Sequence, residues 1–242
     1  MKKKWIALLL AAMALLGTAA LADYEQGVQA KESGNIELAI SYWEEAAKQG
    51  DVQSLYAIGL EYYRGSDVEQ DYEKAVQYFL QAAEQNVVDG LYAMGTLCYN
   101  GQGVEQDYAK AAEWYLKAAE QNHVKAQFYL GLMHRRGYGV VQDDAKAVEW
   151  YLKAAQQGDK GAQNNLGVMY KNGYGVEQDY AKAIEWYMKA VEQNHAGAQY
   201  NLGMMYEYGQ GVEQDMAVAL KWYKKAAEQG LERAISAVER LQ

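Results

Sequence analysis

The feature that most constrains this chain is a period of 36 residues that runs through most of its length. Five glycines keep that step, at Gly59, Gly95, Gly131, Gly167 and Gly203. A second glycine, an aspartate and an alanine keep it as well, and a tryptophan keeps it in four of the five repeats: Gly65, Gly101, Gly137, Gly173, Gly209; Asp71, Asp107, Asp143, Asp179, Asp215; Ala75, Ala111, Ala147, Ala183, Ala219; Trp114, Trp150, Trp186, Trp222. A fixed period of roughly 20–50 residues indicates structural units that bury their apolar faces by stacking on one another.

Each repeat predicts two helices, as the segment 161–196 illustrates. The first helix is expected from about Ala162 to Asn172, because Ala162, Leu166, Met169 and Tyr170 fall on one helical face. A glycine in the middle of this helix costs about 1 kcal/mol relative to alanine. Its recurrence in every repeat therefore predicts a close approach of the partner helix, at a point where no side chain fits.

The sequence also predicts where the two helices begin and end. Gly173 is expected to stop the first helix in a left-handed conformation, and Asp179 to cap the second helix by accepting a backbone N–H. The second helix is expected to end at Asn194. Its counterparts are all glycine or asparagine, the residues that best tolerate a left-handed backbone: Gly50, Asn86, Asn122, Gly158, Gly230.

The period divides the chain into an ordered series of segments. We expect a shorter, degenerate repeat at 23–52, five full repeats between 53 and 232, and a helix at 233–242 that caps the last exposed face. The five full repeats are 53–88, 89–124, 125–160, 161–196 and 197–232.

The first 22 residues are typical of a cleaved export signal. Lys2, Lys3 and Lys4 are followed by an apolar stretch from Trp5 to Leu16, and the segment Ala20–Ala22 has the small-x-small pattern of a cleavage site. The alternative is a membrane anchor, because the uncharged stretch approaches the length of a membrane span. The cleavage pattern favours export, so we expect a mature chain without a membrane span that lies in the periplasm of a bacterium or is secreted.

The charge of the mature chain limits its partners. Removal of the three lysines near the N-terminus would leave 20 basic against 32 acidic residues, a net charge of −12. Nucleic acid is not an expected partner, because affinity for a phosphate backbone comes largely from Lys and Arg. Cys98 is the only cysteine, which excludes an intramolecular disulfide, and its place within a helix indicates a small apolar packing residue.

A longer pattern, L-G-x-x-Y-x-x-G-x-G-V-x-x-D-x-x-K-A-x-x-W-Y-x-x-A, emerges from these features. It is found from Leu166 to Ala190, with Gly167, Tyr170 and Asp179 in place. This pattern resembles the Sel-1-like repeat, a relative of the tetratricopeptide repeat, over about residues 53–232. The resemblance implies an all-α, right-handed α-solenoid whose first helices line a concave groove, and an adaptor role that in bacteria is often exported. A branch of the family with paired cysteines is associated with weak β-lactam binding, and this chain has no such pairs.

No catalytic, metal or cofactor site is expected. His123 and His195 lie in loops 72 residues apart, and His134 stands where other repeats have tyrosine. No pair of residues has the spacing of metal ligands. The serines and the threonine that follow the export signal have no histidine in an adjacent motif position, so we expect no enzyme.

The candidate binding residues follow from the resemblance. In the tetratricopeptide relatives, ligand-facing residues of the first helix lie three before, one after and four after the recurrent glycine. The first of these positions holds Tyr56, Tyr92, Phe128, Asn164 and Tyr200, and the last holds Tyr63, Tyr99, Arg135, Lys171 and Glu207. A core position would not tolerate Arg, Lys and Glu in succession, whereas a binding face would. The alternative is a face that is merely solvated.

We therefore expect a monomeric scaffold that binds a protein or peptide in its groove. Tyr56, Tyr63, Tyr92, Tyr99 and Phe128 should form a contiguous apolar strip outside the packing between helices. The tryptophans should instead be buried between the helices. Two alternatives stay open: a weak hydrolase acting on β-lactams or peptidoglycan, and a secreted protein that binds a host protein.

Overall fold

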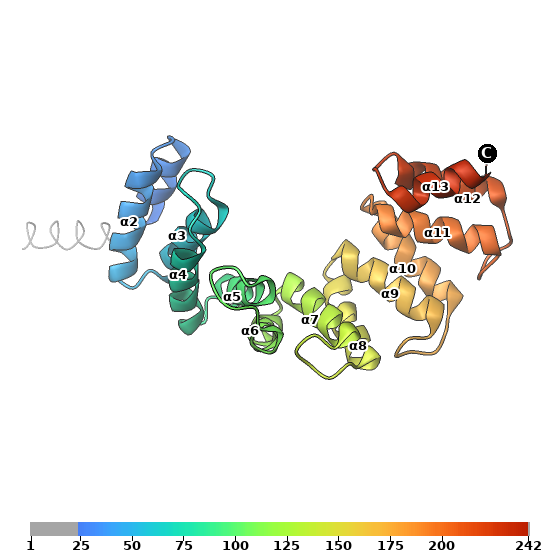
Figure 1. Ribbon diagram of the computed structural model, residues 1–242, viewed down its shortest axis with the longest axis horizontal. Helices are drawn as coiled ribbons and strands as arrows, with labels where there is room; N and C mark the ends of the chain where they lie inside the picture. Colours follow the sequence, from blue (N-terminus) through green and yellow to red (C-terminus); the bar gives the residue numbers. More distant parts are fainter. Residues whose placement is uncertain (1–23, 242) are drawn as a thin grey trace, which may run out of the picture. The chain divides into compact units, whose positions relative to one another are not determined.

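The computed structural model describes residues 24–241, and these residues form helices with no strand among them (Figure 1). Residues 24–32 are helical. The helices that follow are α2 (Ile36–Lys48), α3 (Val52–Arg64), α4 (Tyr72–Glu84), α5 (Val88–Asn100), α6 (Tyr108–Glu120), α7 (Val124–Arg136), α8 (Asp144–Gln156), α9 (Lys160–Asn172), α10 (Tyr180–Glu192), α11 (Ala196–Tyr208), α12 (Met216–Ala227) and α13 (Glu232–Leu241). The expected export signal at 1–22, the expected mature start at Asp23 and the last residue of the chain lie outside the described residues.

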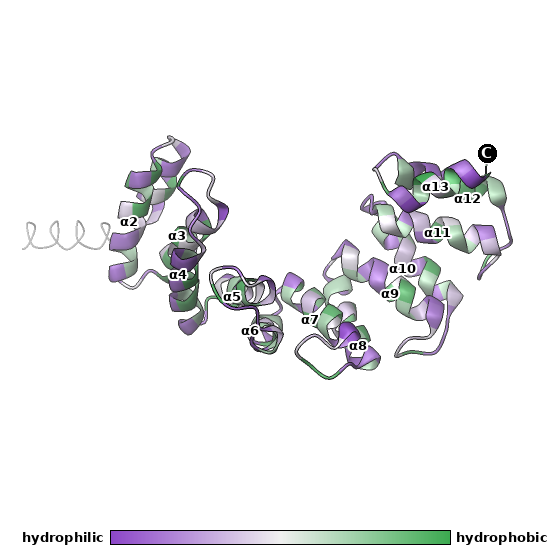
Figure 2. Ribbon diagram, viewed as in Figure 1, coloured by the Kyte–Doolittle hydropathy of each residue, from purple (hydrophilic) through white to green (hydrophobic). Residues whose placement is uncertain are grey.

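The helices belong to two compact units, one formed by residues up to Lys117 and the other by residues from Ala118. Within each unit the helices pack in sequential order, α2 to α5 in the first and α7 to α13 in the second. Apolar and polar residues alternate along the helices in Figure 2. This alternation suits helices that pack one face and expose the other.

The predicted helix ends are confirmed. The Asp179 carboxylate accepts a hydrogen bond from the backbone N–H of Lys182 at 2.9 Å, and the corresponding aspartates of the other repeats cap their helices in the same way. Gly173 ends α9 in the left-handed conformation with φ of 70°. Asn194 also has a positive φ, of 56°, as do its counterparts in the other repeats.

The predicted close approach at the mid-helix glycine is confirmed as well. A Cβ atom at Gly167 would lie 2.4 Å from Cε1 of the Tyr187 ring, and one at Gly95 would lie 2.6 Å from Cδ1 of Tyr115. These distances are far below van der Waals contact, so the ring occupies the space of the missing side chain. The same contact recurs in the other full repeats, between Gly59 and Phe79, Gly131 and Tyr151, and Gly203 and Tyr223.

The prediction that the tryptophans are buried between helices is wrong for the full repeats. The fully buried ring is the tyrosine that follows each tryptophan, as at Tyr151, while Trp150 is only half-buried. The Lys153 ammonium lies 4.0 Å from the Trp150 ring centroid and covers it on the outside. Consecutive helical residues point about 100° apart, so only one of the two can face the glycine. Trp43 is fully buried because it occupies the tyrosine position of its repeat.

Candidate partner-binding site

The side chains three before each recurrent glycine lie over the buried ring of the neighbouring helix. Tyr56, Tyr92, Phe128 and Tyr200 are all half-buried. Their ring centroids lie 5.5 Å (Tyr56–Phe79), 5.7 Å (Tyr92–Tyr115), 5.9 Å (Phe128–Tyr151) and 5.3 Å (Tyr200–Tyr223) from that buried ring. These aromatic residues therefore take part in packing between helices, contrary to the expectation that they stand outside it. Each aromatic ring packs against the buried ring and remains partly accessible to solvent.

The aromatic side chains four after the glycine make a different contact. Tyr63 meets Tyr72 edge to face at 5.7 Å, and Tyr99 meets Tyr108 in the same way at 5.1 Å. Tyr72 and Tyr108 are the first residues of α4 and α6. In these two repeats, the aromatic side chain therefore packs against the first residue of the second helix of its own repeat.

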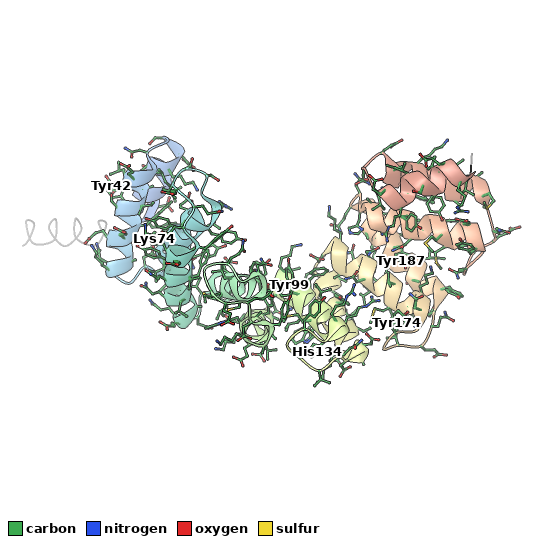
Figure 3. The ribbon with its side chains drawn as sticks, viewed as in Figure 1. Tyr42, Lys74, Tyr99, His134, Tyr174 and Tyr187 are labelled. Carbon is green, nitrogen blue, oxygen red and sulfur yellow. The ribbon has the colours of Figure 1, made fainter. Side chains whose placement is uncertain are left out.

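Three of the predicted residues converge on one pocket in the first unit. Its volume is about 180 Å³, and its lining consists of Tyr56, Leu60, Tyr63, Phe79, Tyr92, Ala93 and Thr96, from α3, α4 and α5. Burial raises the pKa of the Tyr56 hydroxyl, so this group stays a neutral hydrogen-bond donor at physiological pH. Tyr99 is outside this lining, and Figure 3 marks its place on α5. The pocket therefore combines an apolar surface with tyrosine hydroxyl groups.

The predicted residues of the second unit fall in polar surroundings. Arg135 lies 5.3 Å over the ring of Tyr174 and lines a pocket with Arg136, Gln142 and Asp144. Asn164, Lys171 and Tyr200 line a second pocket of about 430 Å³ together with side chains of α10, α11 and α13. Phe128 is outside both linings.

Glu207, which the charge series had placed on the binding face, makes its contacts inside the protein. Its side chain is buried, and its carboxylate accepts hydrogen bonds from the Tyr223 hydroxyl at 2.6 Å and from the Arg240 guanidinium at 2.7 Å. The hydrogen bond from Arg240 lowers the pKa of Glu207 and keeps it ionised. Arg240 comes from α13, which begins 36 residues after α11, the same step that separates the first helices of successive repeats.

Some pocket residues were missed by sequence reasoning. Leu60 and Thr96 stand one residue after the recurrent glycine, a position that the family resemblance had pointed to without residues being assigned there. Ala93 and Asn201 stand two residues before it and carried no signal. Arg233 comes from α13, a helix that sequence reasoning had treated only as a cap, although it begins 36 residues after α11.

Two of the three histidines cap helices, and the cysteine is buried. The Nδ1 atoms of His123 and His195 accept the backbone N–H of Ala126 and Ala198, each at 3.1 Å, and so cap α7 and α11. Cys98 is 4% exposed, and burial raises the pKa of its thiol. Within residues 24–241, no three His, Cys, Asp or Glu side chains are grouped as metal ligands would be. No helix among those residues is long and apolar enough to cross a membrane.

Comparison with known proteins places the chain in a family. Six consecutive segments match the Sel1 repeat, at residues 10–51, 52–87, 88–123, 124–159, 161–195 and 196–231. The chain belongs to the Sel1 repeat family. The all-α, α-solenoid fold class that the family resemblance implied is thereby confirmed. Members of the family are generally scaffolds for protein–protein interaction.

Two solved structures show the same fold at substantial identity. The first is c5321, described as a protective antigen present in uropathogenic Escherichia coli strains displaying an SLR fold, with 35% identity and a TM-score of 0.85. The match covers 92% of this chain and 48% of c5321, so the chain spans about half the length of that relative. The second is a Sel1 repeat protein from Oxalobacter formigenes, with 31% identity, a TM-score of 0.82 and 88% of each chain covered. None of the curated proteins compared with the chain matches it.

Proposed function

We propose that this Sel1 repeat protein is a bacterial export product that acts as a monomeric, non-catalytic scaffold. It binds a segment of a protein partner along the first helices of its repeats, in a concave groove. Residues 1–22 direct it to the periplasm or beyond. The description of the E. coli relative as a protective antigen is compatible with export.

The observation that carries this proposal is the aromatic pocket of the first unit. Tyr56, Tyr63 and Tyr92 surround it, and tyrosine is a favoured anchor for partners because it offers a large apolar area with a polar tip. The pocket is small, so it fits one apolar side chain of a peptide rather than a large ligand. Its lining includes no histidine, carboxylate or thiol, which gives a hydrolase no general base there.

The test replaces an aliphatic side chain of the pocket lining. Leu60 is half-buried in the pocket wall, and Leu60→Glu would place a charge where an apolar side chain docks. Leu116 offers a matched control, since it is 40% exposed on the outer face of α6. We expect Leu60→Glu to weaken partner binding at least tenfold, which corresponds to about 1.4 kcal/mol, and Leu116→Glu to leave it unchanged.

The measurement begins with crosslinking and pull-down from the native cell envelope, followed by titration of the captured partner against both variants. Both variants must keep the helical circular-dichroism signal of the wild type. Equal capture by Leu60→Glu and Leu116→Glu would contradict the proposal, because the pocket would then have no part in recognition. Turnover of a chromogenic β-lactam by the purified protein would favour the hydrolase alternative.

A further inference from the structure

A second pocket of the first unit lies between α4, α5, α6 and the turn that precedes α6. Its volume is about 380 Å³. The apolar part of its lining consists of Val76, Leu80, Met94, Cys98, Val104 and Trp114. The pocket shares no lining residue with the aromatic pocket of the proposed function, so it is a separate site.

The pocket coincides with an unusual residue at one position of the period. Cys98 stands where the other four full repeats have a larger, ring-bearing side chain: Tyr62, His134, Tyr170, Tyr206. A thiol is much smaller than a phenol ring, so the exchange removes bulk of the size of a ring from this place. Space of that size is enough for a ligand, since an apolar cavity of about 150 Å³ already holds benzene.

The backbone around Cys98 is arranged as it is in the repeats that have a tyrosine. The Cys98 carbonyl oxygen accepts a hydrogen bond from the backbone N–H of Asp107 at 2.9 Å. The carbonyl oxygen of Tyr170 accepts the equivalent bond from Asp179, also at 2.9 Å, and the remaining full repeats have it as well. The helix and the turn therefore keep the separation that accommodates a ring.

Other repeats show what surrounds a ring at this position. Tyr62 stacks on Tyr78, with ring centroids 6.1 Å apart and an angle of 8° between the planes. The Lys74 ammonium, labelled in Figure 3, lies 4.9 Å from the centroid of the Tyr62 ring. Lys182 lies over the ring of Tyr170 in the same way, at 5.5 Å. An ammonium over the face of an aromatic ring is attracted by the electrons of that face.

The pocket keeps both of these neighbours. Trp114 stands at the position of Tyr78. Lys110 stands at the position of Lys74, and its Nζ atom lies 3.4 Å from the Asp107 carboxylate. The lysines that cover a ring in other repeats pair with their own aspartates at similar distances, so the ammonium is held in the same place. An aromatic wall and a cation therefore stand where a ring is bound in other repeats.

The charges of the lining favour a neutral ring. Glu105 and Asp107 contribute two carboxylates against the single ammonium of Lys110, so an anionic ligand would be repelled. Burial raises the pKa of the Cys98 thiol, which therefore stays neutral and acts as an apolar wall.

We propose that this pocket binds a small, neutral aromatic molecule with a polar group on its ring, such as a phenol. The ring takes the place that Tyr170 occupies in its own repeat, with Trp114 beside it and the Lys110 ammonium over its face. The polar group reaches water, because the tyrosines at this position in other repeats are only half-buried.

The test uses three neutral probes. 4-Methylphenol has the ring and the hydroxyl of a tyrosine side chain, and 4-methylcyclohexanol has a similar outline without an aromatic face. N-acetyltyrosinamide carries the same ring on a peptide-like backbone. Binding to the purified protein is measured by calorimetric titration, and the NMR signal of the Met94 methyl group reports whether the probe enters this pocket.

We expect saturable binding of 4-methylphenol and binding of 4-methylcyclohexanol that is weaker by about fivefold or more, because only the aromatic face attracts the ammonium. N-acetyltyrosinamide should also bind more weakly than 4-methylphenol. Its backbone would need the space that α5 occupies, since α5 carries the ring at this position in other repeats.

Cys98→Tyr is the decisive variant, because it supplies the ring that three other full repeats have at this position. We expect it to abolish the binding of 4-methylphenol without lowering the thermal midpoint of unfolding. Cys98→Ala is the matched control. It removes the thiol and leaves the pocket open, so it should bind 4-methylphenol as the wild type does.

A second variant tests the cation. Lys110→Met should weaken the binding of 4-methylphenol several-fold and leave that of 4-methylcyclohexanol unchanged. Lys146→Met is its control, because Lys146 pairs with Asp143 at 4.0 Å in the other unit and does not line the pocket.

Four results would overturn the proposal. The first two are no saturable binding of 4-methylphenol and undiminished binding by Cys98→Tyr. Equal binding of 4-methylcyclohexanol would exclude recognition of an aromatic face. Loss of the helical circular-dichroism signal in Cys98→Tyr would show that the pocket does not accept a ring. Tighter binding of N-acetyltyrosinamide than of 4-methylphenol would overturn the assignment to a small molecule and leave a tyrosine side chain of a protein as the occupant.

Discussion

At the residue scale, equivalent positions in different repeats hold different residue types, and the N-cap of the first helix is an example. The residue that precedes the first helix is an aspartate at Asp51 and Asp159 but a histidine at His123 and His195, and all four cap their helix. Aspartate caps as an anion, whereas histidine can cap with Nδ1 only when that atom is unprotonated. The exchange makes the cap that His195 provides sensitive to pH.

This difference predicts a pH dependence of stability. Burial, and then the nearby charges of Lys160 and Arg233, lower the pKa of His195, while Asp159 opposes them. In the unfolded chain, His195 has the ordinary histidine pKa of about 6.5. Just below that pH the unfolded chain therefore binds a proton at His195 more readily than the folded protein does. The contribution of His195 to stability should therefore be complete above about pH 6.5 and be lost as the pH falls.

The measurement compares thermal unfolding of the wild type and His195→Asn at pH 7.5 and pH 5.5. Asparagine keeps a cap acceptor but does not titrate. We expect the wild type to lose more stability than the variant between the two pH values. An identical loss in both proteins would show that His195 does not titrate in this range.

At the scale of the element, the contact between a mid-helix glycine and a buried ring unites the two helices of each repeat. The glycine is unfavourable for the helix by about 1 kcal/mol, yet it admits the ring of Tyr187 against the backbone of α9. At Gly167, helix propensity favours a larger residue whereas packing favours glycine, and the packing effect determines the residue. The half-buried aromatic residues of the candidate site rest on these same rings.

Gly167→Ala measures that opposition. Propensity alone would stabilise α9, but the new Cβ would lie 2.4 Å from the ring of Tyr187, which has no room to move in the core. We expect a net loss of about 1–3 kcal/mol in the free energy of unfolding by urea, the range for overpacked cores. A smaller side chain in the variant Gly167→Ala/Tyr187→Leu should recover part of the loss. Stabilisation by Gly167→Ala would show that propensity governs this position.

At the scale of the whole molecule, the Sel1 repeats account for the chain from residue 10 to residue 231, and the remaining question is where the protein acts. A scaffold has no reaction to identify it, so its compartment limits the partners that it can meet. The proposal of export rests on the basic start, the apolar stretch and the Ala20–Ala22 pattern.

Cleavage after Ala22 would remove the segment with the three lysines and leave a chain that starts at Asp23. Intact-mass analysis of the protein from a periplasmic fraction should give the mass of residues 23–242. The same analysis of the membrane pellet is the control. Full-length protein confined to the pellet would contradict cleavage and favour an anchor.

The sequence by itself determined the repeat, the helix pairs, their caps and the glycine contact. Each of these depends on interactions within one repeat, such as that of Asp179 with Lys182, and a period of 36 residues displays them several times over. The position of the aromatic candidates on the first helix followed from the family pattern. Three of them, Tyr56, Tyr63 and Tyr92, do share a pocket.

Only the tertiary structure decided which ring of each Trp–Tyr pair is buried, because both residues are aromatic and the sequence pattern does not show which one faces the mid-helix glycine. It also decided the state of Glu207 and the arrangement of Lys171, Tyr187 and Arg233. Both depend on α13, a helix beyond the last matched repeat, whose Arg240 binds Glu207 and whose Arg233 lines the pocket. A repeat predicts the contacts that recur, whereas a contact made once, at the end of the array, exists only when the helices are packed together.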